Sequence, residues 1–209
     1  MKVLLIGSGG REHSLALKIK QSPKLTHLFC APGNPGTSEI GQNIPISDSN
    51  IGELLQFAQS ESIDLTIVGP EAPLVSGIVD QFNAQNLRII GPSQAAAQLE
   101  GSKQWAKSFM NRHNIPTASY EVFSDFQTAS DYIQSQSSYP IVIKADGLAA
   151  GKGVTVAQNE SEALGALRRC FIDLEFKDAG ATVVIESFLK GEEASIFAFT
   201  DGKSILPML

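Results

Sequence analysis

The chain has 209 residues, of which 43% are hydrophobic and 18% are charged, and its formal net charge is −6. These proportions are typical of a water-soluble folded protein with one large or two modest hydrophobic cores. The acidic balance argues against a non-specific nucleic-acid binder, which presents a basic face, but leaves room for a small anionic ligand. Cys30 and Cys170 form no metal-binding pattern, which favours a reduced, cytoplasmic setting. The apolar run at residues 3–6 is too short for a secretion signal, and no run approaches the ~18 apolar residues of a membrane helix.

The first hundred residues alternate short apolar runs with amphipathic stretches, which predict buried strands and helices respectively. The predicted strands cover residues 3–6, 25–30, 65–68 and 88–90, and the predicted helices cover residues 11–21, 51–59 and 74–85. This order predicts an α/β fold with a doubly wound parallel sheet. Ligands of such a sheet bind beyond the carboxyl ends of the strands, where the loops GSGG, APGNPG, GPEAP and GPS all fall.

The second half of the chain has a different pattern. Residues 94–114 are mainly helical and end before Pro116, because the residue before a proline avoids the helical conformation. Further strands are predicted at residues 120–123, 141–145, 154–157 and 182–185, with helices at 126–136 and 161–171. Residues 195–199 and 204–206 flank Asp201-Gly202, a pair typical of a β-hairpin turn.

The first motif is GSGGREH at residues 7–13, directly after the first predicted strand. Its glycines allow a tight turn and let backbone N–H groups approach a phosphate at a helix N-terminus. Two details oppose a dinucleotide site: Glu12 stands where GxGxxG needs a third glycine, and no acidic residue follows the second strand to hold a ribose. Arg11 beside the turn favours an anion, whereas a purely structural turn remains the alternative, and His13 is expected to be structural.

The second motif is KADGLAAGKGV at residues 144–154. It is not a Walker A loop, because three residues rather than four separate Gly147 from Gly151, and Gly153 rather than Ser or Thr follows Lys152. A flexible loop of small residues with a lysine at each end can fold over a triphosphate and offer N–H donors and ammonium charge. The composition favours this interpretation over an ordinary solvated hairpin.

The third motif is VVIESFLKGEE at residues 183–193, where an apolar strand enters a short linker. Linker backbone groups could pair with the edge of an adenine, Phe188 and Leu189 could cover its face, and Glu193 could accept hydrogen bonds from a ribose. By itself, an ordinary strand end with surface glutamates explains this pattern better.

Together, six segments resemble the phosphoribosylamine–glycine ligase family of the ATP-grasp superfamily. They are GSGGREH, APGN, GPEAPLVSGIVD, LEGSKQWAKSFMNRHNIPTASY, IVIKADGLAAGKGV and VVIESFLKGEEAS, and they extend over residues 1–209. Two positions depart from the family pattern: Ser14 replaces an alanine and Ser187 a second glutamate. The resemblance implies a preATP-grasp domain at residues 1–118, the small α+β ATP-grasp lobe at 119–190 and the truncated start of the large lobe at 191–209.

The resemblance also implies site residues. Those implied for ATP are Lys103, Lys144, Gly147, Gly151, Lys152, Gly153, Glu186, Phe188, Leu189 and Glu193. Those implied for phosphoribosylamine are Gly9, Gly10, Arg11, Gly33, Asn34 and Glu71. No residue is implied to be a catalytic nucleophile.

The family's chemistry implies that the carboxylate of glycine attacks the γ-phosphate of ATP, and that the amine of 5-phosphoribosylamine then displaces phosphate from glycyl phosphate. The product would be glycinamide ribonucleotide, an intermediate of purine biosynthesis. The partners expected are these small molecules, with neither nucleic acid nor membrane, and the oligomeric state stays open. In the family, the ligands of Mg²⁺ (or Mn²⁺) follow in the large lobe, so we expect no metal ligands and no ligase activity in these 209 residues alone.

A fragment that binds a nucleotide or a sugar phosphate without chemistry remains the alternative. An NAD-dependent oxidoreductase is disfavoured by Glu12 and by the missing acidic residue after the second strand.

Overall fold

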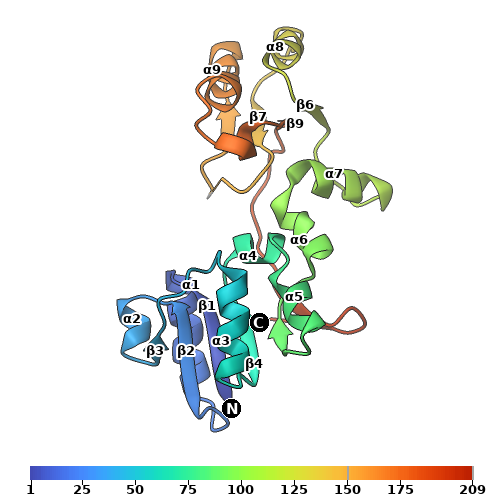
Figure 1. Ribbon diagram of the computed structural model, residues 1–209. Coiled ribbons are helices and arrows are strands. Elements are labelled where there is room, and N and C mark those ends of the chain that lie inside the picture. Colours follow the sequence, from blue (N-terminus) through green and yellow to red (C-terminus); the bar gives the residue numbers. More distant parts are fainter. Residues whose placement is uncertain (150, 209) are drawn as a thin grey trace.

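The computed structural model describes residues 1–149 and 151–208, and Figure 1 shows two bodies joined through two helices. The first body contains a five-stranded, all-parallel sheet in the order β3-β2-β1-β4-β5. Its strands are β1 (Lys2–Gly7), β2 (His27–Pro32), β3 (Gln42–Asn43), β4 (Leu65–Val68) and β5 (Ile89–Ile90), and its helices are α1 (Gly10–Lys20), α2 (Pro35–Ser38), α3 (Ile51–Ser60), α4 (Glu71–Val75) and α5 (Ile78–Ala84). The predicted doubly wound parallel sheet is confirmed.

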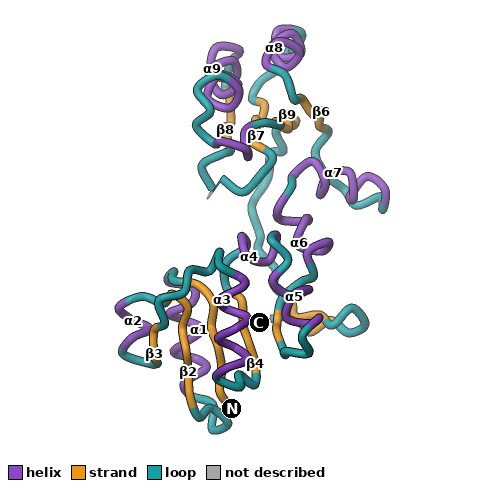
Figure 2. Tube along the Cα trace, in the orientation of Figure 1, coloured by secondary structure: helices purple, strands orange, loops and turns teal. Residues whose placement is uncertain are grey.

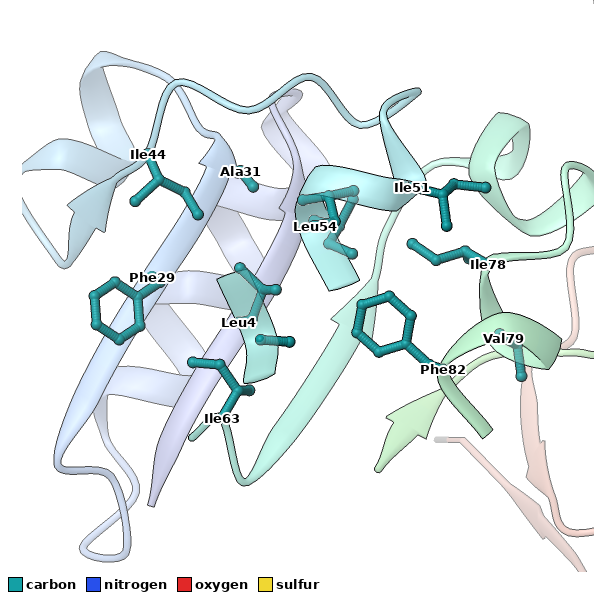
Figure 3. Close-up of a cluster of buried hydrophobic side chains, with 12 residues drawn as sticks. Leu4, Phe29, Ala31, Ile44, Ile51, Leu54, Ile63, Ile78, Val79 and Phe82 are labelled. Carbon is teal, nitrogen blue, oxygen red and sulfur yellow. The ribbon is translucent and has the colours of Figure 1, made fainter. Parts of the chain in front are cut away.

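Both faces of this sheet are covered, which explains the unbroken apolar run of its first strand. Figure 3 shows Leu4 on the face that packs against Leu54 of α3 and Phe82 of α5, and all three side chains are fully buried. Leu5 points the opposite way, into a second cluster with Ala16 of α1. The central strand is therefore buried from both sides and holds the loops at its carboxyl end on a rigid base.

Some elements of this body differ from the prediction. The single helix expected at residues 74–85 is two helices, α4 and α5, because Gly77 adopts a left-handed conformation (φ +84°) between them. The loop APGNPG contains the short helix α2, which Asn34 caps by accepting a hydrogen bond from the Thr37 N–H at 3.0 Å. Strand β3 was not predicted, since two residues carry no periodic pattern.

The second body is an antiparallel sheet in the order β6-β9-β7-β8. Its strands are β6 (Tyr120–Phe123), β7 (Ile141–Ala145), β8 (Val154–Ala157) and β9 (Val183–Ser187), with helices α8 (Phe126–Gln134), α9 (Glu160–Phe171) and the 3₁₀ helix η1 (Lys177–Gly180). Figure 2 shows α8 and α9 on the same side of the strands. The other face of the sheet carries neither helix. Helices α6 (Gln94–Gly101) and α7 (Lys103–Arg112) connect the two bodies.

The last described residues form the predicted hairpin, with β10 (Ala198–Thr200) paired antiparallel to β11 (Ile205–Pro207). Its apolar side chains are exposed; Ile196 and Phe197 retain 87% and 66% of their accessible surface. Within residues 1–149 and 151–208, no helix is long and apolar enough to cross a membrane.

Candidate functional site

The face of the second sheet opposite α8 and α9 carries charged side chains at its centre. Along β7, Ile141, Ile143 and Ala145 are buried beneath α8 and α9, while Val142 and Lys144 point to the opposite face. This alternation follows from the two-residue period of a strand. The prediction that Lys144 lies on a strand leading into the glycine loop is confirmed.

The register of the sheet sets the neighbours of these side chains. Val142 lies opposite Glu186 on β9 and Val156 on β8, and Lys144 lies opposite Val154 on β8. Val154 and Val156 are 45% and 42% exposed, although both belong to a sheet. The face is therefore an open apolar strip beside one lysine and one glutamate, which suits a flat ring with a charged substituent.

Glu186 is the centre of a charge cluster. Only 6% of its surface is exposed, and its Oε2 lies 2.9 Å from Lys107 Nζ while its Oε1 lies 2.9 Å from Lys144 Nζ. The contact with Lys144 has ion-pair distance but not hydrogen-bond direction, so Oε1 has no hydrogen-bond partner among the described residues. Lys107, on α7, was not identified from the sequence, because a lysine in an amphipathic helix resembles a solvated surface residue.

Lys103 reaches the same region from the first turn of α7. Its Nζ donates to the backbone oxygens of Asp146 and Gly147 at 3.3 and 3.1 Å, at the start of the glycine loop. Burial lowers the pKa of Lys103, and Lys144 lowers it further, while Asp146 and Glu186 oppose the shift. The three residues predicted to face phosphates and base at this position, Lys103, Lys144 and Glu186, thus gather in one place.

The carboxylate of Asp146 ties the glycine loop to the α6–α7 junction. It accepts hydrogen bonds from the Gln104 N–H at 2.6 Å and from the Ser102 hydroxyl at 3.0 Å. The Ser102 hydroxyl in turn accepts from the Trp105 N–H at 3.0 Å and caps α7. The helix that carries Lys103 and Lys107 is therefore fastened to the loop that follows Lys144. Sequence reasoning did not single out Asp146 or Ser102.

The glycines of the loop serve different purposes. A side chain on Gly147 would collide with the backbone of Ala179, and one on Gly153 would collide with Ala149. Gly151 has φ +77° and open space around it, as expected at a mobile tip. Lys152 is exposed, and Ala150 lies outside the described residues.

The linker after β9 is open to solvent. Phe188 and Leu189 are 44% and 68% exposed, and Phe188 lines a cavity of about 290 Å³ together with Ser187. Glu193 is exposed and makes no ion pair or side-chain hydrogen bond with another described residue. The parts predicted for Phe188, Leu189 and Glu193 in nucleoside binding stay predictions, as does that of Lys152.

A second candidate site lies at the carboxyl ends of β1 and β4. A cavity of about 370 Å³ is lined by Ser8, Gly9, Gly10, Arg11, Glu12, Asp48, Pro70 and Glu71. Arg11 donates to the Gly69 oxygen at 2.6 Å and pairs with Glu71 Oε1 at 2.9 Å. The hydrogen bond to Glu71 and the charge of its carboxylate raise the pKa of Arg11. The pKa of Glu71 is lowered, because its carboxylate accepts hydrogen bonds from the backbone N–H of Glu71 and from Arg11.

Glu12 holds the loops of this site together. It is buried, accepts a hydrogen bond from the Gly9 N–H at 2.7 Å, and fills the space that side chains on Gly7 and Gly69 would otherwise enter. The N–H of Gly9 is consequently occupied by a protein carboxylate. Glu12, which replaces the third glycine of the dinucleotide pattern, is therefore a structural part of a different turn.

Asn34 and Gly33 connect the second loop to the first. The Asn34 amide donates to the oxygens of Ser8 and Gly9 at 2.9 and 3.2 Å, and the Gly33 N–H donates to the Gly7 oxygen at 3.1 Å. Both amide hydrogens of Asn34 are therefore used within the protein. Its predicted contact with a substrate stays a prediction, as do those of Gly9, Gly10, Arg11, Gly33 and Glu71.

Two family models cover the chain. The N domain of phosphoribosylglycinamide synthetase matches residues 1–100, and the ATP-grasp (A) domain of phosphoribosylglycinamide synthetase matches residues 101–209. Together with the fold of the second body, these matches define a protein of the ATP-grasp class. The chain belongs to the phosphoribosylglycinamide synthetase family.

Individual proteins agree with this assignment. The chain is 55% identical over 210 residues to the phosphoribosylamine–glycine ligase of Escherichia coli K12, an alignment that covers 100% of this chain and 49% of that protein. It matches the crystal structure of phosphoribosylamine–glycine ligase from Thermotoga maritima with TM-score 0.80 and 30% identity, over 99% of this chain and 49% of the other. The biotin carboxylase domain of Hydrogenobacter thermophilus 2-oxoglutarate carboxylase shares the fold, with TM-score 0.71 and 16% identity over 90% of this chain and 44% of that one.

The chain spans about half the length of the curated relatives it matches. Among the described residues, no three His, Cys, Asp or Glu side chains come together in a group that could hold a metal ion.

Proposed function

We propose that this chain is the ATP-binding and sugar-phosphate-binding portion of a phosphoribosylamine–glycine ligase. The observation that carries the proposal is the meeting of Lys144 and Glu186 with Lys103 beside the glycine loop, on the face of the second sheet opposite α8 and α9. Its parts would be a preATP-grasp domain at residues 1–118, the small lobe at 119–190 and the start of the large lobe at 191–209.

In this proposal, the base of ATP lies on the apolar strip formed by Val142, Val154 and Val156, and its edge meets the linker at Phe188 and Leu189. The exposed area of the valines supplies the apolar surface that a ring would remove from water. Glu193 would hold the ribose. Strand β9 ends at Ser187, so the linker that follows lies outside the ladder of the sheet, and its backbone groups would bond the base.

The triphosphate then lies toward Lys103, Lys144 and the loop with Gly147, Gly151, Lys152 and Gly153. Lysine side chains and unpaired backbone N–H groups favour the negative charge that moves between the phosphates during transfer. Gly151, with open space around it, would let the loop close and exclude water.

The first site would hold the sugar phosphate. The N-terminus of α1 at Gly10, an eleven-residue helix, favours a phosphate, and Arg11 adds a full positive charge beside it. Glu71 could accept hydrogen bonds from the sugar hydroxyls once it exchanges part of its contact with Arg11. Gly9, Gly33 and Asn34 shape the turn that leaves the pocket open.

The complete reaction would join glycine to 5-phosphoribosylamine through glycyl phosphate, releasing ADP and phosphate in purine biosynthesis. Holding the two reacting groups together and excluding water supply most of the acceleration in such a transfer, and no protein nucleophile is required. Magnesium would screen the phosphates when bound. We propose that the 209 residues bind ATP without ligating.

The alternative is a fragment that binds a nucleotide or sugar phosphate without chemistry. In either case we propose a cytoplasmic protein that acts on small molecules.

Calorimetric titration with ATP tests the proposal. We expect saturable binding by the chain and a loss of roughly tenfold or more in affinity for Lys144→Ala, because the phosphates lose a partly buried cation. Lys24→Ala, on the first body, is the matched control and should bind as the unchanged chain does. Absence of ATP binding to the unchanged chain would overturn the proposal, and ligation by the purified 209 residues would overturn the claim that they only bind.

A further inference from the structure

Lys107 is a buried cation that the proposed function does not use. Its side chain is 8% exposed, and its Nζ is held by Glu186 Oε2 at 2.9 Å, the Thr117 hydroxyl at 2.8 Å and the Ala118 oxygen at 3.3 Å. The ring of Tyr120 lies below it, 5.6 Å from Nζ to the ring centre. With these contacts on every side, Lys107 is fixed and does not reach a ligand.

Lys144 occupies a different position on the same carboxylate. Its side chain is 27% exposed, and Glu186 Oε1, at 2.9 Å, is its ion-pair partner. Both lysines lie at the same distance from Glu186, but Lys107 is buried and also donates to Thr117 and Ala118, whereas Lys144 is more open to solvent. The three side chains together leave one positive charge uncompensated at the open end of the cluster.

We propose that Lys107 is a positioning residue that neutralises Glu186 through its buried oxygen Oε2, so that the charge of Lys144 stays available to the phosphates of a nucleotide. The ligand concerned is a nucleoside polyphosphate, and this inference rests on the proposed function of the same site.

The physical reason is the cost of a buried, unpaired carboxylate. Without Lys107, Glu186 would have Lys144 as its only partner, and the pair would be neutral. A phosphate would then have to draw Lys144 away from a buried carboxylate that has no other cation. With Lys107 in place, Lys144 can turn toward the phosphates while Glu186 keeps its counter-ion.

A merely structural role for Lys107 would give a different result. If Lys107 only fastened α7 to β6 and β9, its loss would weaken every ligand of the site alike. The proposed role weakens the phosphate-bearing ligand selectively. The ratio of the dissociation constant of adenosine to that of ATP separates the two, because contacts with the nucleoside cancel in it.

The test measures this ratio by calorimetry for the unchanged chain and for Lys107→Met, Lys107→Arg, Glu186→Gln and the double variant Lys107→Met/Glu186→Gln. We expect the ratio to fall about tenfold or more in Lys107→Met, which makes the cluster neutral, and to stay within about twofold in Lys107→Arg, which keeps the charge. Glu186→Gln should raise the ratio. The double variant should restore it, because one uncompensated charge remains on Lys144.

Equal weakening of ATP and adenosine in Lys107→Met would overturn the inference and leave the proposed function standing. If Lys107→Met does not fold, the other variants decide. The inference is overturned if the ratio of the adenosine to the ATP dissociation constant falls in Glu186→Gln, or if it stays below that of the unchanged chain in the double variant. If the unchanged chain binds neither ligand, the proposed function fails first and this inference with it.

Discussion

The two candidate sites both present positive charge to an anion, but they are built in opposite ways. At the carboxyl ends of β1 and β4, the charged pair of Arg11 and Glu71 is open to solvent, with 60% and 42% of the side chains exposed. On the second sheet, the pair of Lys107 and Glu186 is buried, with 8% and 6% exposed.

The difference follows from where the parts of each site come from. The first site uses loops that follow neighbouring strands of one sheet. Hydrogen bonds that Asn34 and Gly33 donate, together with the one that Glu12 accepts from the Gly9 N–H, hold them in place. The second site joins α7, β7 and β9, which come from distant parts of the chain, and buried charges meet where they join. Exposed ion pairs contribute little to stability, whereas removing one partner of a buried ion pair leaves an unpaired buried charge, which is strongly destabilising.

The largest expected effect comes from breaking the buried pair. Lys107→Ala should reduce the free energy of unfolding of the second body by about 3 kcal/mol, because Glu186 loses its better-held partner. Arg11→Ala, the matched change in the exposed pair, should cost less than about 1 kcal/mol after allowance for solvent screening. Urea unfolding followed by the fluorescence of Trp105, which lies on α7, measures the first change, and circular dichroism measures both. Equal losses in the two variants would remove the distinction between the sites.

Glu12→Ala tests whether the first site depends on a single buried acceptor. The variant leaves the Gly9 N–H without its partner and opens a space between Gly7 and Gly69, so we expect a loss of about 2 kcal/mol. Hydrogen exchange should quicken at the amides of β1 and α1 and stay unchanged in β7 and β9. Faster exchange in both bodies would show that the sites are not held independently.

Ser102→Ala probes the tie between α7 and the glycine loop. Loss of the cap and of the bond to Asp146 should destabilise α7 by about 1 kcal/mol. ATP should bind a few-fold more weakly, since Lys103 and Lys107 would be less well placed. Ser93→Ala, which removes the cap of α6 instead, is the control and should leave ATP binding as it is. A similar loss of affinity in both variants would contradict a specific role for the tie.

The smallest expected effect is a pH dependence from Lys103. Because burial lowers its pKa, its charge is lost at a lower pH than that of an ordinary lysine, and ATP affinity should fall by a few-fold as pH rises through the range below the ordinary lysine pKa of about 10.4. The folded form binds this proton less tightly than the unfolded chain does, so the contribution of Lys103 to stability rises with pH over the same range. Lys103→Arg should flatten the binding profile, as measured by titration at several pH values. An unchanged profile would exclude Lys103 from phosphate binding.

Much of the fold was predictable because its signals are local. The run at residues 3–6 indicates a strand buried on both faces, and Gly7 and Gly33 mark turns that need φ above zero. The break at Gly77 was missed because both halves of the predicted helix share one apolar face. The candidate site was predictable to the extent that it lies in glycine-rich segments, namely Lys144, the loop after it and the strand that ends near Glu186.

The sequence by itself determined the parallel type of the first sheet, the order of the strands along the chain and the loops at which ligands are expected, because periodicity and glycine placement act over a few residues. Only the tertiary structure decided the partners of the charges. Lys107 is 79 residues from Glu186 along the chain, and nothing in the helix period distinguishes it from a solvated lysine; its burial arises only when α7 packs against β6 and β9. In the sequence, Glu12 is a departure from a known motif; in the structure, the loops at Gly7 and Gly69 meet around it. Long-range electrostatics depend on where the elements pack, and that is a property of the folded chain.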